Sequence, residues 1–345
     1  MATSCSRGSL LSALLLAWLV AGTLTAEIQV VTTLPAYASI AESVGGDRVA
    51  VSAISRADED AHFVKPKPSF ALRLRSADLF VATGLDLEVW VPVLIDKSGN
   101  RSIREGARGY VSASAGVPLL DVPATVDRSA GDVHAFGNPH IFTSPINAKA
   151  IAANIVRGLQ RVDPEGASYY ERRLDAFVDR IDRALYGKEL VDILGSDSLD
   201  SLAREGSLID FLESKELRGR PLIDSLGGWL GRTRAFRGRP IVAYHKNWIY
   251  LTELLGLDVV DFVEPKPGIP PSARHVHRLI ETMRDREIRV LLAASYFSAQ
   301  QIQSIADRTG SRAVRVPLGP SAAGPTDYIA VVDLWIDELT AAFTE

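Results

Sequence analysis

The chain has very little cysteine: Cys5 is the only one among 345 residues. A single cysteine forms no internal disulfide. With no CxxC or Cys/His spacing around it, the sequence also excludes a thiolate zinc ribbon and a dithiol redox centre. Any metal ion that this protein binds must therefore be held by nitrogen and oxygen atoms.

An excess of positive charge is also missing. The chain has 38 Lys and Arg residues against 42 Asp and Glu, a formal net charge of −4. Binding to a polynucleotide needs a basic surface, so we expect no nucleic-acid partner. The remaining composition, 47% hydrophobic and 23% charged, is that of a folded globular protein rather than a disordered chain or a coiled coil. Its length suits about two domains.

The first 26 residues have the pattern of a secretory signal peptide. Arg7 precedes an apolar run over residues 10–21, and small residues follow up to Ala26. We predict cleavage after Ala26 and an exported protein, most simply a periplasmic one. The apolar run is short for a bilayer span, although an uncleaved anchor is the alternative. Cys5 lies before the run, so it is not placed to become a lipidated N-terminus.

The chain after Glu27 alternates short β-branched runs with helical patterns, first over residues 27–145 and again over residues 239–345. Such alternation predicts α/β lobes with mostly parallel sheets flanked by helices. The predicted strands are 28–33, 48–54 and 78–84 in the first lobe, and 240–245, 258–264, 288–294 and 313–318 in the second. The predicted helices are 36–45, 69–77, 87–99, 246–256, 272–286, 298–309 and 326–343.

Residues 146–238 between the two lobes lack strong strand signals. We assign 146–195 to a linker that contains one long rigid helix from Pro164 to about Leu194, roughly 45 Å at 1.5 Å per residue. Residues 196–238 are polar and Gly-punctuated, and we assign them to a helical insertion. Ligands of α/β sheets bind beyond the carboxyl ends of the strands, so two facing lobes predict a site in the cleft between them.

Three histidines fall where such a cleft would lie. His62 sits in a loop stiffened by Pro66 and Pro68, His140 is in GNPHIFTSP, and His245 ends a predicted strand in VAYHKNW. Taken alone, a histidine at such a position is more often a hydrogen-bonded structural residue than a metal ligand. Three imidazoles plus an oxygen nevertheless complete a tetrahedral zinc site. Only the fold can bring them together, because they are far apart in the sequence.

The other histidines are weaker candidates. His134, in GDVHAFGNPH, is interpreted as a loop residue that caps or donates a hydrogen bond, with a smaller chance of joining the metal. His275 and His277 lie in a predicted helix, where positions i and i+2 point to different faces, so they make poor joint ligands.

The residues that carry these features also carry a resemblance to a family. Over essentially the whole mature length the sequence resembles the zinc and manganese solute-binding proteins of metal-uptake ABC transporters. The matching segments are VVTTLPAYASIAESVGGDRVAV, DAHFVKPKPSFALRLRSADLFVATGLDLE, GNPHIFTSPINAKAIAANI, YHKNWIYLTELLGLDVVDFVEPKPGIPPSARHV and TDYIAVVDLWIDEL. The resemblance implies a periplasmic protein with two lobes joined by a long helix. It further implies capture of a transition metal between the lobes and its delivery to a membrane permease.

The resemblance transfers ligands residue by residue. His62 matches the histidine of the family's PHxYxPxPS segment, and His140 matches that of its NPHxWxDP segment. Phe262 stands where zinc members have histidine and manganese members have glutamate. His245 matches a family histidine that usually lies near the site without necessarily binding. We expect His245, or Glu264 two residues past Phe262, to supply the missing ligand.

The fourth position and the metal follow from the same comparison. The family's late aspartate has no counterpart, because residues 316–321 (VPLGPS) contain no carboxylate, so water or Glu264 would fill the fourth position. Imidazole-rich sites favour Zn²⁺, whereas Mn²⁺ prefers oxygen ligands, so we predict zinc as the transported ligand, with manganese as the alternative. Binding needs neutral imidazoles and should weaken as the pH falls through about 6 to 7.

A zinc hydrolase is the rival function, since three histidines and a bound water also serve catalysis. The sequence contains no HExxH or GxSxG motif, which favours a binding protein over an enzyme. A surface adhesin would need an outer-surface anchor, and no segment supplies one. No GxxxxGK[ST] segment occurs, so the transport energy must come from a separate ATPase subunit. We expect a monomer whose lobes move little.

Overall fold

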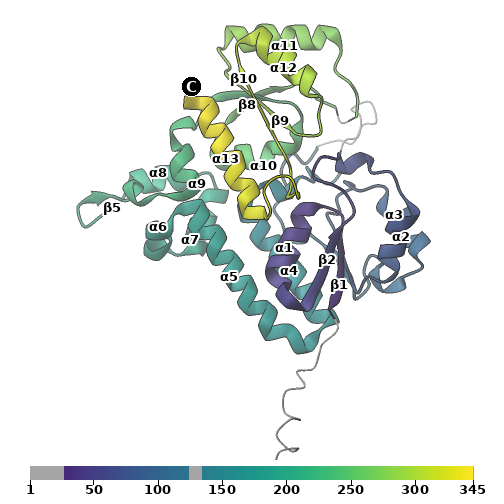
Figure 1. Cartoon of the computed structure of the whole chain (residues 1–345). Helices are drawn as coiled ribbons and strands as arrows, with labels where there is room; N and C mark the ends of the chain where they lie inside the picture. The colour runs from purple at the N-terminus through teal and green to yellow at the C-terminus, as the bar shows by residue number, and fades with distance from the viewer. Residues whose placement is uncertain (1–26, 124–133, 267, 345) are drawn as a thin grey trace, which may run out of the picture.

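The computed structural model describes residues 27–123, 134–266 and 268–344. The predicted signal peptide lies outside the described residues. Two four-stranded sheets, one in each half of the chain, lie side by side and are flanked by helices, and a helical segment projects from one side (Figure 1). The predicted α/β fold class with two lobes is confirmed. The predicted domain boundaries stay a prediction.

The N-terminal sheet is fully parallel, with the order β2-β1-β3-β4. Its strands are β1 (Ile28–Thr32), β2 (Val49–Ala53), β3 (Leu79–Ala82) and β4 (Tyr110–Ser112). The first three coincide with predicted strands. The fourth was not predicted, because three residues are too few for a visible alternation of apolar and polar side chains.

The C-terminal sheet is also parallel, with the order β10-β9-β7-β8. Its strands are β7 (Pro240–Ala243), β8 (Asp258–Phe262), β9 (Val290–Ala294) and β10 (Arg312–Val316). All four were predicted. The central strand β9 is buried along its whole length, as expected of a parallel strand covered on both faces.

The helices begin where the sequence supplies first-turn prolines or side-chain caps. Prolines stand in the first turns of α1, α2, α3 and α4, and the hydroxyls of Ser144, Ser272 and Ser298 cap α4, α11 and α12. The N-terminal half contains α1 (Pro35–Gly45), α2 (Pro68–Arg75), α3 (Val91–Ser98) and α4 (Pro145–Val162). The C-terminal half contains α10 (Ile249–Leu255), α11 (Ala273–Asp285), α12 (Ala299–Thr309) and α13 (Tyr328–Thr344).

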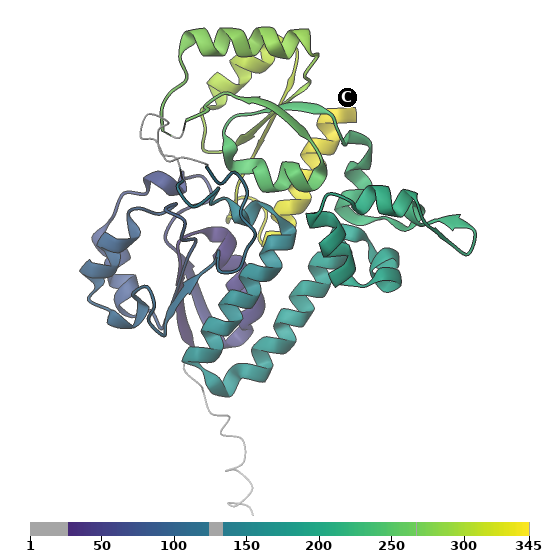
Figure 2. The same ribbon diagram turned by 180° about the vertical axis from the view of Figure 1, so that it is seen from behind.

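The long connecting helix is shorter than predicted. Helix α5 covers Ala167–Tyr186, about 30 Å, and runs beside α4 (Figure 2). The predicted continuation to Leu194 is wrong, since Gly187 has φ 83° and ψ 148° and ends the helix. A Cβ atom at Gly187 would lie 2.8 Å from the Cα of Gly227, so the chain turns where two glycine backbones touch.

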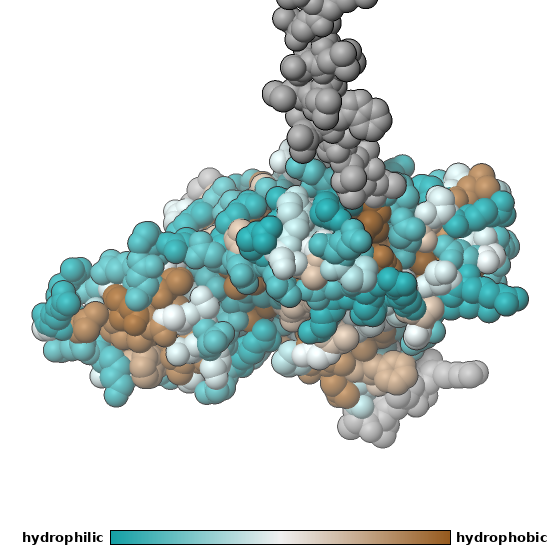
Figure 3. Space-filling model, turned by 90° about the horizontal axis from the view of Figure 1, so that it is seen from below, coloured by the Kyte–Doolittle hydropathy of each residue, from teal (hydrophilic) through white to brown (hydrophobic). Residues whose placement is uncertain are grey.

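The segment after the break forms the projecting part of the molecule. It contains α6 (Lys188–Leu194), α7 (Ser196–Arg204), α8 (Leu208–Glu213) and α9 (Gly228–Thr233). The prediction of a purely helical insertion missed a hairpin of β5 (Glu216–Leu217) and β6 (Arg220–Pro221), whose strands have only two residues each. Apolar side chains gather on the face of this projecting end shown in Figure 3.

One hydrophobic core runs through both halves of the molecule. It includes Val30 of the first sheet, Leu292 of the second and Val332 of α13, with two smaller clusters on the outer sides of the sheets. Helix α13 contacts both α1 and the second sheet. Within the described residues, no helix combines the length and hydropathy that crossing a bilayer would require.

Candidate metal site

The three predicted histidines meet where the two halves of the chain face each other. His62 lies in a short 3-10 turn after β2, and His140 immediately precedes the turn that leads into α4. His245 lies two residues after the end of β7 and caps the next 3-10 turn. The ring centroids of His62 and His140 are 5.2 Å apart, those of His140 and His245 6.1 Å, and those of His62 and His245 6.3 Å. All three side chains are buried.

The orientation of each ring is fixed by an acceptor at its Nδ1 atom. His62 Nδ1 lies 2.7 Å from a carboxylate oxygen of Asp60, and His140 Nδ1 lies 3.0 Å from the amide oxygen of Asn138. His245 Nδ1 lies 3.0 Å from the backbone oxygen of Glu264. An Nδ1–H that donates to these oxygens leaves the lone pair on Nε2. Histidines that bind metals usually donate their other ring N–H to an oxygen in this way.

A fourth imidazole joins the group. His134 Nε2 lies 3.1 Å from His62 Nε2, and the two rings stack with centroids 5.2 Å apart. The centroids of His134 and His140 are 6.2 Å apart. From its sequence context, His134 is interpreted first as a capping or hydrogen-bonding loop residue and only second as a metal ligand. Its position six residues before His140, in the same loop, was the available signal.

Burial keeps three of these imidazoles, those of His134, His140 and His245, neutral. Loss of solvent lowers the pKa of His134 and of His245 to about 4, and it lowers the pKa of His140 well below its usual value. Mutual repulsion among the rings acts in the same direction. Asp60 behaves differently: burial alone would raise its pKa, but its contacts with His62 outweigh this and lower it. A neutral imidazole cluster beside a carboxylate is suited to a cation.

The two residues considered for the missing ligand are placed as follows. The carboxylate of Glu264 accepts a hydrogen bond from the backbone N–H of Gly268 at 3.0 Å, and burial raises its pKa. The backbone oxygen of Glu264 accepts a hydrogen bond from Nδ1–H of His245. Phe262 offers no donor atom from its side chain, and its backbone oxygen lies 2.8 Å from His275 Nε2. The exposed His277 pairs with Glu281.

Nε2 atoms that would bind a metal already contact other nitrogen atoms in this structure. His62 Nε2 faces His134 Nε2, and His140 Nε2 lies 3.2 Å from the amide nitrogen of Asn247. Within the described ranges, no set of three or more His, Cys, Asp and Glu side chains is already arranged to hold an ion. A cavity of about 20 Å³, enough for one small species, lies beside His62 and His140 and is lined from the second half by Tyr296 and Gly319. Metal binding must therefore separate existing nitrogen–nitrogen contacts.

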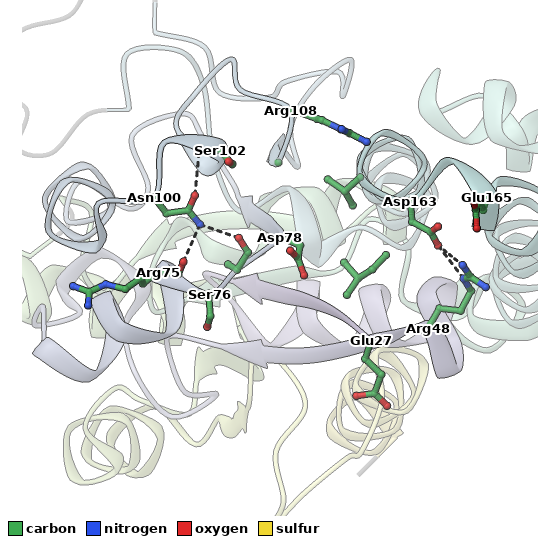
Figure 4. Close-up of a pocket in the computed structure, with 14 residues that line it drawn as sticks. Glu27, Arg48, Arg75, Ser76, Asp78, Asn100, Ser102, Arg108, Asp163 and Glu165 are labelled. Atoms are coloured by element: carbon green, nitrogen blue, oxygen red, sulfur yellow. Dashed lines mark hydrogen bonds and ion pairs between the residues drawn. The ribbon is translucent and has the colours of Figure 1, made fainter. Parts of the chain in front are cut away.

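A pocket of about 770 Å³ lies elsewhere, at the end of the first sheet where its strands begin (Figure 4). Several of its polar groups already have partners. Arg48 pairs with Asp163 at 2.7 Å, and the Asn100 amide donates to backbone oxygens at the end of α2, including that of Ala77 at 2.9 Å. We therefore assign this pocket a structural role and place the candidate site at the histidines.

Two α/β halves with clustered, neutral imidazoles where they face each other define a two-lobe metal-binding protein. The chain belongs to the family described as periplasmic component A of the zinc-uptake complex, ZnuA, whose model matches residues 30–185 and 223–342. The family model leaves 186–222 unmatched, which is most of the projecting segment. The predicted membership in the family of metal-uptake solute-binding proteins is confirmed.

Relatives and solved structures agree with this membership. The chain is 24% identical to the iron-binding protein YfeA of Yersinia pestis over 92% of this chain and 86% of that protein. It is 22% identical to the high-affinity zinc uptake system protein ZnuA of Bacillus subtilis over 83% and 76%. A crystal structure of a zinc-bound ZnuA deletion mutant matches with a TM-score of 0.67 and 21% identity, covering 92% of this chain and 98% of that one. At such identities the structural match shows the fold alone.

Proposed function

We propose that this protein captures a divalent transition metal, Zn²⁺ in the first place, between its two lobes and delivers it to a membrane permease driven by a separate ATPase subunit. The single observation that carries the proposal is the convergence of His62, His140 and His245 from both halves of the chain. Each has its Nδ1 fixed and its Nε2 directed away from that partner. Relatives named for iron binding, for zinc uptake and for manganese transport support the same class of cargo.

Three properties accompany this proposal. Membership in a periplasmic family and the signal-like residues 1–26 support export and cleavage after Ala26. The absence of motifs for hydrolysis supports a binding protein rather than an enzyme. From the sequence, Glu264 or water is the candidate for the fourth coordination position.

Zinc titration of the mature protein tests the proposal. Competition with a chromophoric chelator should show one tight site per chain, and His62→Ala, His140→Ala and His245→Ala should each lower the affinity by at least about tenfold, because each removes a direct nitrogen ligand. His277→Ala is the matched control, since His277 is exposed on α11 and pairs with Glu281 in its own helix.

Metal analysis of protein purified without chelator should find zinc in preference to manganese, and the zinc-loaded protein should show no ester or peptide hydrolysis. Unchanged affinity in all three histidine variants would remove the proposed site. Metal-dependent turnover that is lost in the same variants would move the protein to the hydrolase class.

A further inference from the structure

The segment from His134 to His140 carries a fourth imidazole into the cluster, and backbone hydrogen bonds set its course. The backbone N–H of Gly137 donates to the oxygen of His134 at 3.2 Å, closing a turn, and the N–H of Asn138 donates to the oxygen of Leu120 at 2.8 Å. Gly137 has φ 116°, and a Cβ atom there would lie 3.1 Å from the Leu119 side chain. The turn therefore needs glycine, and it sets His134 over His62.

The contact between His134 and His62 has the geometry of two ligands on one ion. Two nitrogens bound to one tetrahedral zinc at 2.0–2.1 Å are about 3.3 Å apart. The two Nε2 atoms are 3.1 Å apart in this structure. Since the Nδ1–H of His62 donates to Asp60, the Nε2 lone pair of His62 accepts the Nε2–H of His134 in this structure. When an ion binds, His134 must carry its proton on Nδ1, so that both Nε2 lone pairs address the ion.

The nearby oxygen atoms have other partners. The Glu264 carboxylate accepts from Gly268, the Glu264 carbonyl oxygen serves His245, and the Phe262 carbonyl oxygen serves His275. The imidazole of His134 already touches His62, whereas the carboxylate of Glu264 is engaged by the backbone N–H of Gly268.

We infer that His134 is the fourth protein ligand, so that the site is built from four imidazoles and selects Zn²⁺ over Mn²⁺. The inference rests on the proposed function and specifies its metal. Neutral imidazole nitrogen suits zinc, whereas manganese is bound best by carboxylate and carbonyl oxygens. With four nitrogen ligands and no bound carboxylate, the site disfavours the harder ion. The fourth ligand comes from a loop rather than from a strand end, so it can leave first when the ion is released.

His134→Ala in the mature full-length protein tests the inference, with His277→Ala as control and Glu264→Ala as the competing ligand variant. We expect His134→Ala to bind zinc at least about tenfold more weakly, with a smaller ratio of zinc to manganese affinity, and Glu264→Ala to lose less. The absorption spectrum of bound Co²⁺ should change in His134→Ala as a nitrogen ligand is replaced. Added imidazole should restore both the spectrum and the affinity, which it would not do for a residue that only shapes the loop.

Each outcome decides a separate point. Wild-type affinity, selectivity and Co²⁺ spectrum in His134→Ala would overturn this inference while leaving the proposed function intact. A large loss in Glu264→Ala together with no loss in His134→Ala would give the fourth position to Glu264. Absence of zinc binding by the wild-type protein, or no effect of His62→Ala and His140→Ala, would overturn the proposed function and this inference together.

Discussion

Single residues outside the ligand set control how the ligands stand, and Asn138 is the clearest case. Its buried amide oxygen receives both the backbone N–H and the Nδ1–H of His140 at 3.0 Å, and its amide nitrogen donates to the Lys246 carbonyl oxygen at 2.9 Å. One side chain thus orients a ligand and connects the two halves of the chain.

We expect Asn138→Ala to lower the zinc affinity by about 10- to 100-fold, because removing the partner of a ligating histidine frees its ring and its tautomer. Asn154→Ala is the matched control. Asn154 is also buried, but its hydrogen bonds in the described residues go to Ala113, Ala115 and Arg157 rather than to the histidines. Equal affinities of the two variants, measured by chelator competition, would contradict the role of Asn138.

The depressed pKa values of the histidines make a second prediction at this scale. The folded protein holds His134 and His245 at a pKa of about 4, whereas the unfolded chain has values near 6.5. Between these two pH values the unfolded state binds protons that the folded state does not. The free energy of unfolding of the metal-free protein should therefore fall as the pH drops from about 6.5 to about 4.

For the same reason, the loss of zinc affinity should move below the window of about 6 to 7 that free histidines would give. Thermal melts and zinc titrations at pH 7.5, 5.5 and 4 provide the test. Zinc affinity that already falls steeply between pH 7.5 and 5.5 would contradict the depressed pKa values.

At the scale of elements, the end of α5 depends on one glycine. Gly187 and Gly195 have nearly the same backbone conformation, with φ 83° and 75°, and each precedes a short helix. They differ in their surroundings, because a Cβ at Gly187 meets the Gly227 backbone, whereas a Cβ at Gly195 has nothing within 4 Å.

Gly195→Ala should therefore cost only backbone strain, about 1–3 kcal/mol. Gly187→Ala should cost clearly more, because it adds a collision that pushes α9 away from α5. Urea unfolding of the two variants measures the difference. Equal midpoints and slopes would show that the contact between Gly187 and Gly227 does not fix the bend.

At the scale of the whole molecule, the two lobes are held by more than the connecting helix. Hydrogen bonds join them at Asn138 and Lys246, at Thr143 and Asn247 (3.2 Å), and at Tyr250 and Asn138 (2.6 Å). The shared hydrophobic core continues through the same region. A wide hinge motion would break these contacts and expose apolar surface.

We therefore expect metal loading to change the radius of gyration very little. Small-angle scattering of the metal-free and zinc-loaded protein measures this change directly, and the forward scattering gives the mass expected of a monomer. A pronounced compaction on loading would contradict the rigid arrangement, and a doubled mass would contradict the monomer.

Local pattern in the sequence was enough to predict seven of the eight strands of the two sheets, the α/β class, the family and three histidines of the candidate site. This worked because apolar periodicity, helix caps and short motifs are properties of neighbouring residues. The predictions failed where the determining contact is distant. The bend at Gly187 depends on Gly227, 40 positions later, and β4 needs β3 beside it to be recognised as a strand.

The position of His134 was also missed because it depends on a contact that is distant in the sequence. Its imidazole lies against that of His62, 72 residues earlier in the chain, and no local pattern encodes that contact. The sequence by itself determined which kinds of atom could hold a metal, because it contains histidines and almost no cysteine. Only the tertiary structure decided which of these histidines stand together and which acceptor turns each ring, because those choices depend on packing between segments far apart in the chain.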